Sequence, residues 1–403
     1  MIMHRLLSRA LAALLATAMA SGLACAAPRR VLHVSLYPYI PDAPAAALAL
    51  KQGFERQHPD VIVDITLNQN YYSLTPVDKG LLFETADVHE IDVVFLKDFV
   101  DGHRLAPLSK ALRASLTGLE PLARTAATVK GELVAAPQWM CADFLIYRAD
   151  KTALAEAYSL GALEQALGPD HGLLMDLKGD NTLGEIYLSH LLALEGDPAQ
   201  AAVGVGAAPD PEIVSRFQRL LALEPAGFGR RADYDARGVF YARQFARRAG
   251  DAFVGYSEMT HEVLDETAVS CRVEDHCVTA PEIRVAAMPF EDGRVRPAVW
   301  VDMFAIDAKT HGQSRTDAET FIRYAVSLPA YRVLLIPNGG APPRYLLPAF
   351  QAPFDDPEIL KAAPLYPQFR AIMEKGAVVT GPGLSQRLQG VATIIDAALP
   401  TDH

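Results

Sequence analysis

The chain has 403 residues, of which 50% are hydrophobic and 21% are charged, and its formal net charge is −11. This length and composition are those of a globular protein with room for two lobes, each with its own core. The acidic balance argues against a nucleic acid as partner, because nucleic acids select basic surfaces, and it is compatible with a small cationic ligand.

Residues 1–26 have the pattern of a secretory signal peptide. A basic start that ends at Arg9 precedes an apolar run at residues 10–20, and Ala24-Cys25-Ala26 forms a small-x-small cleavage site. The apolar run is too short to span a bilayer, and no later stretch is long and apolar enough to do so. We therefore expect a secreted or periplasmic protein that starts at Ala27. A lipid anchor at the cysteine of the cleavage site is the weaker alternative.

Strand and helix signals alternate over the first hundred residues. Residues 31–37 and 61–67 are predicted strands, residues 43–56 are a predicted helix, and the apolar run at 91–96 is a predicted short buried strand. The order strand, helix, strand, loop, strand predicts an α/β lobe with a mostly parallel sheet.

The middle of the chain is richer in helix formers, with the clearest helices predicted at residues 185–194 and 211–223. A short strand follows at residues 252–256, and residues 298–306 are a predicted strand that returns to the first sheet. A helix is predicted at residues 317–328. A helical insert between two sheet segments, in an exported chain of this size, is typical of periplasmic solute-binding proteins, which bind ligands in the cleft between two lobes.

The predicted fold is therefore a two-lobe, periplasmic-binding-protein-like (class II) α/β fold with a central cleft. We expect residues 27–140 and 295–345 to form the first α/β lobe. Residues 141–294 and 346–403 are expected to form the second, more helical lobe. Such a fold does not by itself imply catalysis.

Cys141 is the cysteine that lacks an obvious partner. Cys25 lies in the expected signal peptide, while Cys271 and Cys277 flank a short polar stretch and are spaced so that they could pair. An odd thiol in an exported protein indicates intermolecular pairing or a reactive group. The alternative is a buried core cysteine, since a free cysteine packs as a small hydrophobe. In a two-lobe protein the chain would cross between lobes near Cys141, which would put the thiol on the cleft wall.

A thiol is mostly neutral at neutral pH and needs a nearby base to act as a nucleophile. Glu258, in Gly255-Tyr256-Ser257-Glu258, follows a predicted strand and precedes a helical stretch, so its carboxylate can point into a cleft. The alternative is that Ser257 caps the helix and Glu258 only complements the helix dipole. Asp143 is close to Cys141 in sequence, but its charge would oppose thiolate formation.

Aromatic and acidic residues follow the predicted strands of the first lobe. Tyr37 and Tyr39 come after the first strand and Tyr72 after the second, at the strand ends where ligands bind in open α/β sheets. Their rings could stack on a flat heterocycle, or they could pack within loops. Asp92 and Asp302 lie in apolar strands, where a buried aspartate needs a partner. Each aspartate is therefore either hydrogen-bonded for structure or aimed at a ligand.

Other chemistries have weaker signals. His261 and Asp265 are one helical turn apart, but the second histidine of a zinc protease motif is missing, so a solvated helix face is favoured. The sequence has no paired-cysteine zinc spacing, no phosphate-binding glycine loop and no Gly-x-Ser-x-Gly elbow.

Several motifs together resemble one family, thiaminase I (thiamine pyridinylase), a secreted enzyme on a solute-binding-protein scaffold. They keep the order of that family from near the mature N-terminus to about residue 349, which is most of the mature chain. The matching stretches are Leu36-Tyr37-Pro38-Tyr39-Ile40-Pro41-Asp42, Tyr72-Ser73, Asp92-Val93-Val94-Phe95-Leu96, residues 137–141, residues 144–148, Phe253-Val254-Gly255-Tyr256-Ser257-Glu258, Val301-Asp302 and Arg344-Tyr345-Leu346-Leu347-Pro348-Ala349.

The resemblance implies that Cys141 is the nucleophile and that Glu258 is the base that activates it. Trp300 stands where the family has a tyrosine, so its ring can stack but no hydroxyl is available. A further family tyrosine matches either Tyr234 or Tyr241, and we predict Tyr241 as the substrate-binding residue of the two. The residues implied to surround or hydrogen-bond the pyrimidine are Tyr37, Tyr39, Tyr72, Asp92 and Asp302.

The implied reaction starts with addition of the thiolate to the pyrimidine of thiamine, after which the thiazole leaves. A second nucleophile, such as an amine, pyridine or thiol, then adds at the methylene and expels the cysteine. The resemblance implies no metal, no organic cofactor and a monomer. One alternative is a non-catalytic solute-binding protein for thiamine or a related heterocycle. Another is a carbohydrate-binding lipoprotein that uses Trp139 or Trp300 as a sugar platform.

Overall fold

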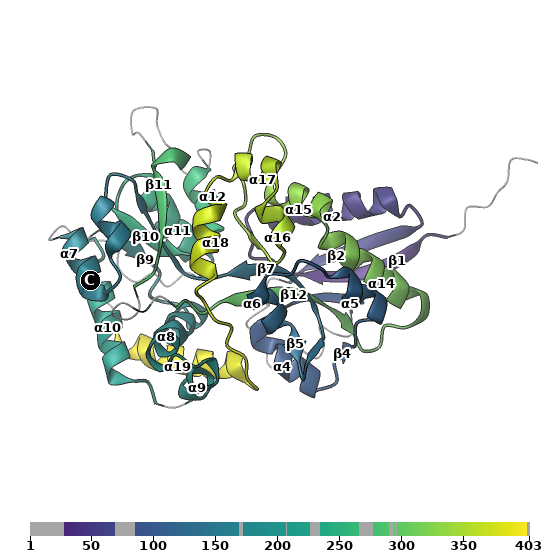
Figure 1. The fold of residues 1–403 in the computed structure, drawn as a ribbon, viewed down its shortest axis with the longest axis horizontal. Helices are drawn as coiled ribbons and strands as arrows, with labels where there is room; N and C mark the ends of the chain where they lie inside the picture. The colour runs from purple at the N-terminus through teal and green to yellow at the C-terminus, as the bar shows by residue number, and fades with distance from the viewer. Residues whose placement is uncertain are drawn as a thin grey trace, which may run out of the picture.

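The computed structural model describes residues 28–68, 85–168, 172–206, 208–225, 234–265, 277–289, 294 and 296–400. The expected signal peptide, Tyr72 and Cys271 lie outside these residues. The described chain is elongated, with one β-sheet toward each end (Figure 1). Among the described residues, no helix is both long enough and apolar enough to cross a bilayer.

Within the described residues, the first sheet has seven strands: β1 (Arg30–Leu36), β2 (Val61–Leu67), β3 (Val88–Asp92), β4 (Leu105–Ala106), β7 (Ala136–Cys141), β12 (Trp300–Asp307) and β13 (Leu347–Pro348). Their order is β13-β7-β12-β3-β1-β2, with β4 paired to β12. Parallel pairing joins β1 to β2 and β3, but β12 is antiparallel to β3 and β7. The sheet is therefore mixed, where a mostly parallel one was predicted, because β12 returns from the other sheet instead of through a crossover helix.

The strand predicted at residues 91–96 is wrong. The strand β3 ends at Asp92, and the apolar run continues as helix α4 (Val93–Asp101). The Asp92 carboxylate accepts a hydrogen bond from the Val94 N–H at 3.0 Å, which caps this helix. The apolar residues 93–96 are all buried, and a short apolar run alone does not distinguish such a helix from a buried strand.

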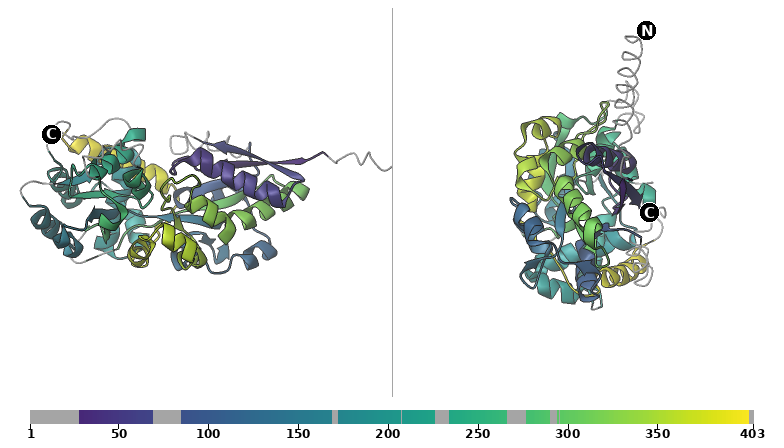
Figure 2. Two further views of the ribbon diagram at one scale, coloured as in Figure 1. Left: turned by 90° about the horizontal axis from the view of Figure 1, so that it is seen from above. Right: turned by 90° about the vertical axis from the view of Figure 1, so that its right-hand side faces the viewer.

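Helices cover the first sheet. Helix α2 (Ala43–Gln57) contacts α14 (Gly312–Ala325) and α15 (Leu328–Leu335), and lies beside them in Figure 2. Ser327 caps α15, so two helices replace the single one predicted at residues 317–328. The smaller elements around this sheet are α5 (Lys110–Ser115), α6 (Pro121–Ala126), β5 (Thr128–Val129), β6 (Glu132–Leu133), α16 (Gln351–Phe354) and α17 (Pro357–Ala362).

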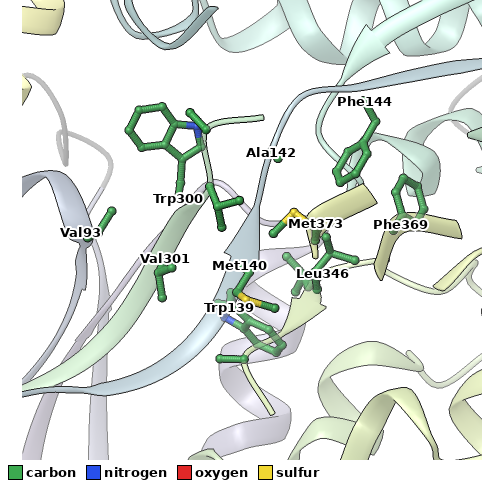
Figure 3. Packing of buried hydrophobic residues seen from close by; sticks show 14 of the residues in the cluster. Val93, Trp139, Met140, Ala142, Phe144, Trp300, Val301, Leu346, Phe369 and Met373 are labelled. Atoms are coloured by element: carbon green, nitrogen blue, oxygen red, sulfur yellow. The ribbon is translucent and has the colours of Figure 1, made fainter. Parts of the chain in front are cut away.

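The second sheet has four strands in the described residues: β8 (Phe144–Arg148), β9 (Leu173–Met175), β10 (Ala252–Gly255) and β11 (Ile283–Ala287), in the order β11-β8-β10-β9. Phe144 packs edge-on against Phe369, with ring centroids 4.7 Å apart (Figure 3). The helices near this sheet are α7 (Leu160–Leu167), α8 (Asp180–Glu195), α9 (Pro198–Gly204), α10 (Pro211–Leu221), α11 (Tyr234–Ala246), α12 (Met259–Leu264), α18 (Tyr366–Met373) and α19 (Leu384–Ala398), with 3₁₀ turns at Thr152–Glu156 and Ala280–Glu282.

The two sheets are joined by a very short link. Only Ala142 and Asp143 separate β7 of the first sheet from β8 of the second, and Figure 3 shows Ala142 where the chain leaves β7 toward Phe144. This link places Cys141, the last residue of β7, at the junction of the sheets. The lobe boundaries expected from the sequence stay a prediction.

Candidate active site

Strand pairing brings four sequence-predicted residues onto one face of the first sheet. In the antiparallel ladder Trp300 pairs with Cys141, and Asp302 pairs with Asp92. Directly opposed residues share a sheet face, and so do residues i and i+2 of one strand. These four residues line a cavity of about 40 Å³, which we call the small cavity.

Glu258 reaches the small cavity from the second sheet. It follows β10 and stands at the N-cap of α12, so the cap predicted at Ser257 is wrong. The Ser257 hydroxyl instead lies 3.4 Å from a Glu258 carboxylate oxygen, to which it donates. Burial raises the pKa of Glu258 to about 7. A carboxylate with a pKa near neutrality is matched to take a proton at physiological pH.

Cys141 is a free thiol, and it is half-buried. Cys277, by contrast, is disulfide-bonded. Burial and the nearby Glu258 and Asp302 carboxylates raise the pKa of the Cys141 thiol well above its usual value. The sulfur is therefore held as a thiol, which would have to lose its proton before it could act as a nucleophile. Glu258 lines the same cavity and has a pKa suited to receive that proton.

The two aspartates of the small cavity have different surroundings. Burial and the neighbouring Asp92 and Glu90 carboxylates raise the pKa of Asp302 well above its usual range. Asp302 Oδ1 is buried and has no hydrogen-bond partner among the described residues. Asp302 therefore holds a proton more readily than an exposed aspartate, and a protonated carboxyl can donate a hydrogen bond. Asp92 lines the cavity and also caps α4.

Two buried glutamates that support the site were missed from the sequence. Glu90 accepts a hydrogen bond from the Tyr37 backbone N–H at 2.8 Å, which fixes the residue that follows β1. Burial raises the pKa of Glu90 to about 7. Glu185 of α8 lines the small cavity and accepts a hydrogen bond from the Tyr256 hydroxyl. A glutamate inside an apolar strand or on the apolar side of a helix is the signal that could have revealed them.

A second, larger space adjoins the small one. It has a volume of about 390 Å³, and we call it the large cavity. The two cavities share Tyr37, Ile40, Tyr256 and Glu258 as lining residues. Tyr39 lines the large cavity, and its ring meets that of Tyr37 edge-on, with centroids 5.4 Å apart. Of the two tyrosines predicted after β1, Tyr37 therefore lies where the cavities meet and Tyr39 lies on the wall of the large one.

The loop before β13 contacts both the tyrosine loop after β1 and helix α12. The buried Arg344 guanidinium donates to the Pro41 carbonyl at 2.9 Å and pairs with Asp42 at 3.3 Å, beside the tyrosine loop. His261 of α12 is also buried, and its Nδ1 lies 3.0 Å from the Pro342 carbonyl oxygen. The solvated helix face predicted for His261 is therefore wrong, because α12 packs against this loop.

Tyr241 lies apart from the other predicted residues. It is 0% exposed in α11, and its ring packs edge-on against Phe240 with centroids 5.3 Å apart. Tyr241 was predicted to contact the substrate, but it lines neither the small nor the large cavity. Its side chain packs in the core instead. In the described ranges, no group of three or more His, Cys, Asp or Glu side chains is arranged to hold a metal ion.

No protein-family model matches the chain. Thiaminase-1 of Paenibacillus thiaminolyticus is 26% identical to it over 357 residues, which are 85% of this chain and 81% of that protein. The chain is a homologue of thiaminase I. This likeness was expected from the ordered motifs, and it spans the segments that carry Cys141 and Glu258.

Solved structures share the fold of this chain. Thiaminase I from Bacillus thiaminolyticus superimposes with a TM-score of 0.77 at 23% identity, covering 92% of this chain and 100% of that one. Clostridium botulinum thiaminase I in complex with thiamin superimposes with a TM-score of 0.76 at 19% identity, covering 91% of this chain and 99% of that one. Maltose-bound T. maritima MalE3 superimposes with a TM-score of 0.68 at 17% identity, covering 92% of this chain and 94% of that one. These likenesses establish the fold, and the predicted α/β fold of the periplasmic-binding-protein type is confirmed.

Proposed function

We propose that this thiaminase I homologue is an exported thiamine pyridinylase, a transferase that replaces the thiazole of thiamine with another nucleophile. The observation that carries the proposal is that Cys141, at the end of β7, and Glu258, between β10 and α12, line one cavity together with Asp92 and Asp302. Addition to a pyrimidine needs a thiol, a base whose pKa is near neutrality and a protonated carboxyl.

In the first half of the reaction, Cys141 adds to the pyrimidine ring. Its proton passes to Glu258, and a bond forms between the sulfur and a ring carbon beside a ring nitrogen. The protonated Asp302 donates a hydrogen bond to the ring, which makes it more electrophilic. The electron pair of the adduct then breaks the bond from the methylene to the thiazolium nitrogen. The thiazole leaves as a neutral molecule, and the adduct is neutral because thiolate and thiamine carry opposite unit charges.

In the second half, the incoming nucleophile adds to the methylene of the adduct. The electrons return to break the carbon–sulfur bond, and the released thiolate recovers its proton from Glu258. A pyridine gives a cationic product, whereas a primary amine also releases one proton to solvent. All bonds and charges balance with no metal or organic cofactor. Positioned proton transfer of this kind contributes on the order of 10²–10⁴ in rate.

The surroundings of the site support a cationic substrate. No lysine, arginine or histidine lines either cavity among the described residues, while both are lined by carboxyl groups. We further propose that residues 1–26 direct export and that the lobes divide at residues 140, 294 and 345, with the substrate between them. Intact mass of the mature protein checks the cleavage site.

The test is incubation of the purified protein with thiamine and pyridine, with products identified by mass spectrometry. We expect free thiazole and the pyridinium exchange product, and a mass shift on the Cys141 peptide when the second nucleophile is withheld. Cys141→Ser is expected to lower exchange by at least ~10³-fold while still binding thiamine. Full exchange by this variant would remove the assigned nucleophile.

A non-catalytic solute-binding protein is the second candidate. It is favoured by neighbours of the same fold that are binding proteins, among them a solute-binding protein from Agrobacterium vitis with bound D-mannitol, at a TM-score of 0.68 and 17% identity. A receptor has no need of a free thiol beside a carboxylate. Unchanged thiamine bound tightly after long incubation with pyridine would favour the receptor over the enzyme.

A further inference from the structure

Asp143 is a buried carboxyl group that the reaction above does not use. It is 4% exposed and lies in the two-residue link between the sheets. Cys141, two residues earlier, lines the small cavity, whereas Asp143 lines the large one. The end of β7 and the link that follows it thus place one side chain in each of two adjoining cavities.

One oxygen of Asp143 has nothing to bind within the described protein. Asp143 Oδ2 is buried and has no hydrogen-bond partner there. Leaving a buried carboxyl oxygen unpaired costs free energy, so its persistence at a cavity wall points to an occupant of the cavity. Burial also raises the pKa of Asp143 to about 7, as expected for a carboxyl group taken out of water.

The other walls of the large cavity favour a flat cation. Besides Asp143, the acidic side chains facing it are Glu258 from the β10–α12 turn, Glu262 from α12, Asp176 after β9 and Asp42 before α2. Two of these are compensated: Glu262 pairs with Arg243 at 3.0 Å, and Asp42 pairs with Arg344. The aromatic lining residues are Tyr37, Tyr39, Phe253 and Tyr256, whose faces attract cations.

The two-cavity layout matches a substrate made of two rings joined by one methylene. The thiol and Asp302 line the small cavity, so the ring that is attacked lies against this wall. The shared residues, Tyr37 and Glu258 among them, then stand beside the methylene, where the bond breaks. The second ring, which carries the positive charge, extends into the large cavity.

We propose that Asp143 is the substrate-binding residue for this cationic ring, and that the large cavity is its subsite. This inference rests on the proposed function. Before cleavage the ring is a cation and pairs with the Asp143 carboxylate in a site of low polarity. After cleavage the leaving thiazole is neutral and that attraction is gone. Asp143 therefore distinguishes substrate from product and promotes release of the leaving group.

The test measures binding without turnover, in a Cys141→Ser background. Thiamine and a neutral probe, 4-amino-5-hydroxymethyl-2-methylpyrimidine, are titrated calorimetrically against the parent and against Asp143→Asn. A lost charge-assisted contact predicts ~10- to 100-fold weaker thiamine binding, with the neutral probe changed less than ~3-fold. Asp176→Asn is the comparison, because Asp176 Oδ1 already accepts from the Lys178 N–H at 3.1 Å. Its loss of thiamine affinity is expected to be several-fold smaller.

The outcomes separate this inference from the proposed function. Equal losses for both probes, or no loss of thiamine affinity, would overturn the role of Asp143 while exchange activity of the wild-type protein still stood. Absence of exchange in the wild-type protein would instead overturn the proposed function. Asp143→Asn keeps the size of the side chain, and thermal unfolding of each variant shows whether a loss reflects misfolding. If Asp143→Asn does not fold, Asp143→Glu tests the same claim, since a retained but displaced charge must keep the preference for the cation.

Discussion

Trp300 lies directly opposite Cys141 in the antiparallel pair of β12 and β7. The indole is 3% exposed and lines the small cavity, and its Nε1–H has no hydrogen-bond partner among the described residues. A buried donor without a partner beside a thiol is a destabilising arrangement unless a ligand accepts from it. In the proposed reaction, Trp300 is therefore expected to supply both a flat surface and a hydrogen-bond donor to the ring that Cys141 attacks.

Trp300→Phe tests this arrangement. The phenyl ring keeps the flat surface but removes the donor, so KM for thiamine is expected to rise ~5- to 10-fold, corresponding to one hydrogen bond. The free protein is expected to lose no thermal stability from the missing N–H, because that group has no partner to lose. Trp300→Tyr restores a hydroxyl and is expected to recover part of the affinity. An unchanged KM in Trp300→Phe would show that the indole donates to nothing in the complex.

Glu258 sets the expected pH dependence of turnover. Its pKa is about 7 in the free protein, and the base must be ionised to accept the Cys141 proton. The ratio kcat/KM is therefore expected to fall about tenfold per pH unit below that value. Glu258→Gln is expected to lower kcat by ~10²–10⁴ and to abolish this acidic limb. An acidic limb that persists unchanged in Glu258→Gln would assign it to another group.

The same buried carboxyls predict an unusual dependence of folding stability on pH. Glu90, Asp143 and Glu258 have folded-state pKa values of about 7, above their ordinary values of 3.8 to 4.5. Between those values the folded state holds protons that the unfolded state has lost, so stability falls as pH rises toward 7 and then levels off. Each group contributes up to about 1.4 kcal/mol per pH unit.

Urea unfolding at pH 5, 6, 7 and 8 measures this slope. Glu258→Gln is expected to flatten it, because a neutral amide removes one of the titrating groups. A pH-independent free energy of unfolding from pH 5 to 8 would contradict the raised pKa values. Thiamine bound to the Cys141→Ser protein is expected to offset the loss at high pH by pairing with the ionised carboxyls.

Helix α8, which carries Glu185, packs against α19. A Cβ added at Gly184 would lie 2.7 Å from the Leu388 carbonyl oxygen, so Gly184→Ala must push the helices apart. We expect Gly184→Ala to destabilise the protein by about 1–3 kcal/mol. Gly390→Ala, on α19, is the matched control: nothing lies within 4 Å of its added Cβ. It is expected to stabilise the helix by about 0.5–1 kcal/mol. Thermal unfolding compares the two.

Local patterns were enough to predict most elements. The strands expected at residues 31–37, 61–67 and 298–306 correspond to β1, β2 and β12, because alternation and β-branched content are local properties. The strand expected at 91–96 failed for the converse reason. Whether Asp92 continues a strand or caps a helix depends on the room that neighbouring strands leave for α4, and no short window of sequence encodes that.

By itself the sequence determined the kinds of groups present: an unpaired thiol at Cys141, a glutamate after a strand at Glu258, and aspartates among apolar residues. Only the tertiary structure decided their neighbours, because strand register joins residues more than 150 positions apart, as it does Cys141 and Trp300. The same holds for Asp143, Glu90 and Glu185. Their sequence neighbours do not reveal how deeply the packed sheets and helices bury their carboxyl groups, and that burial is what raises the pKa values of the site.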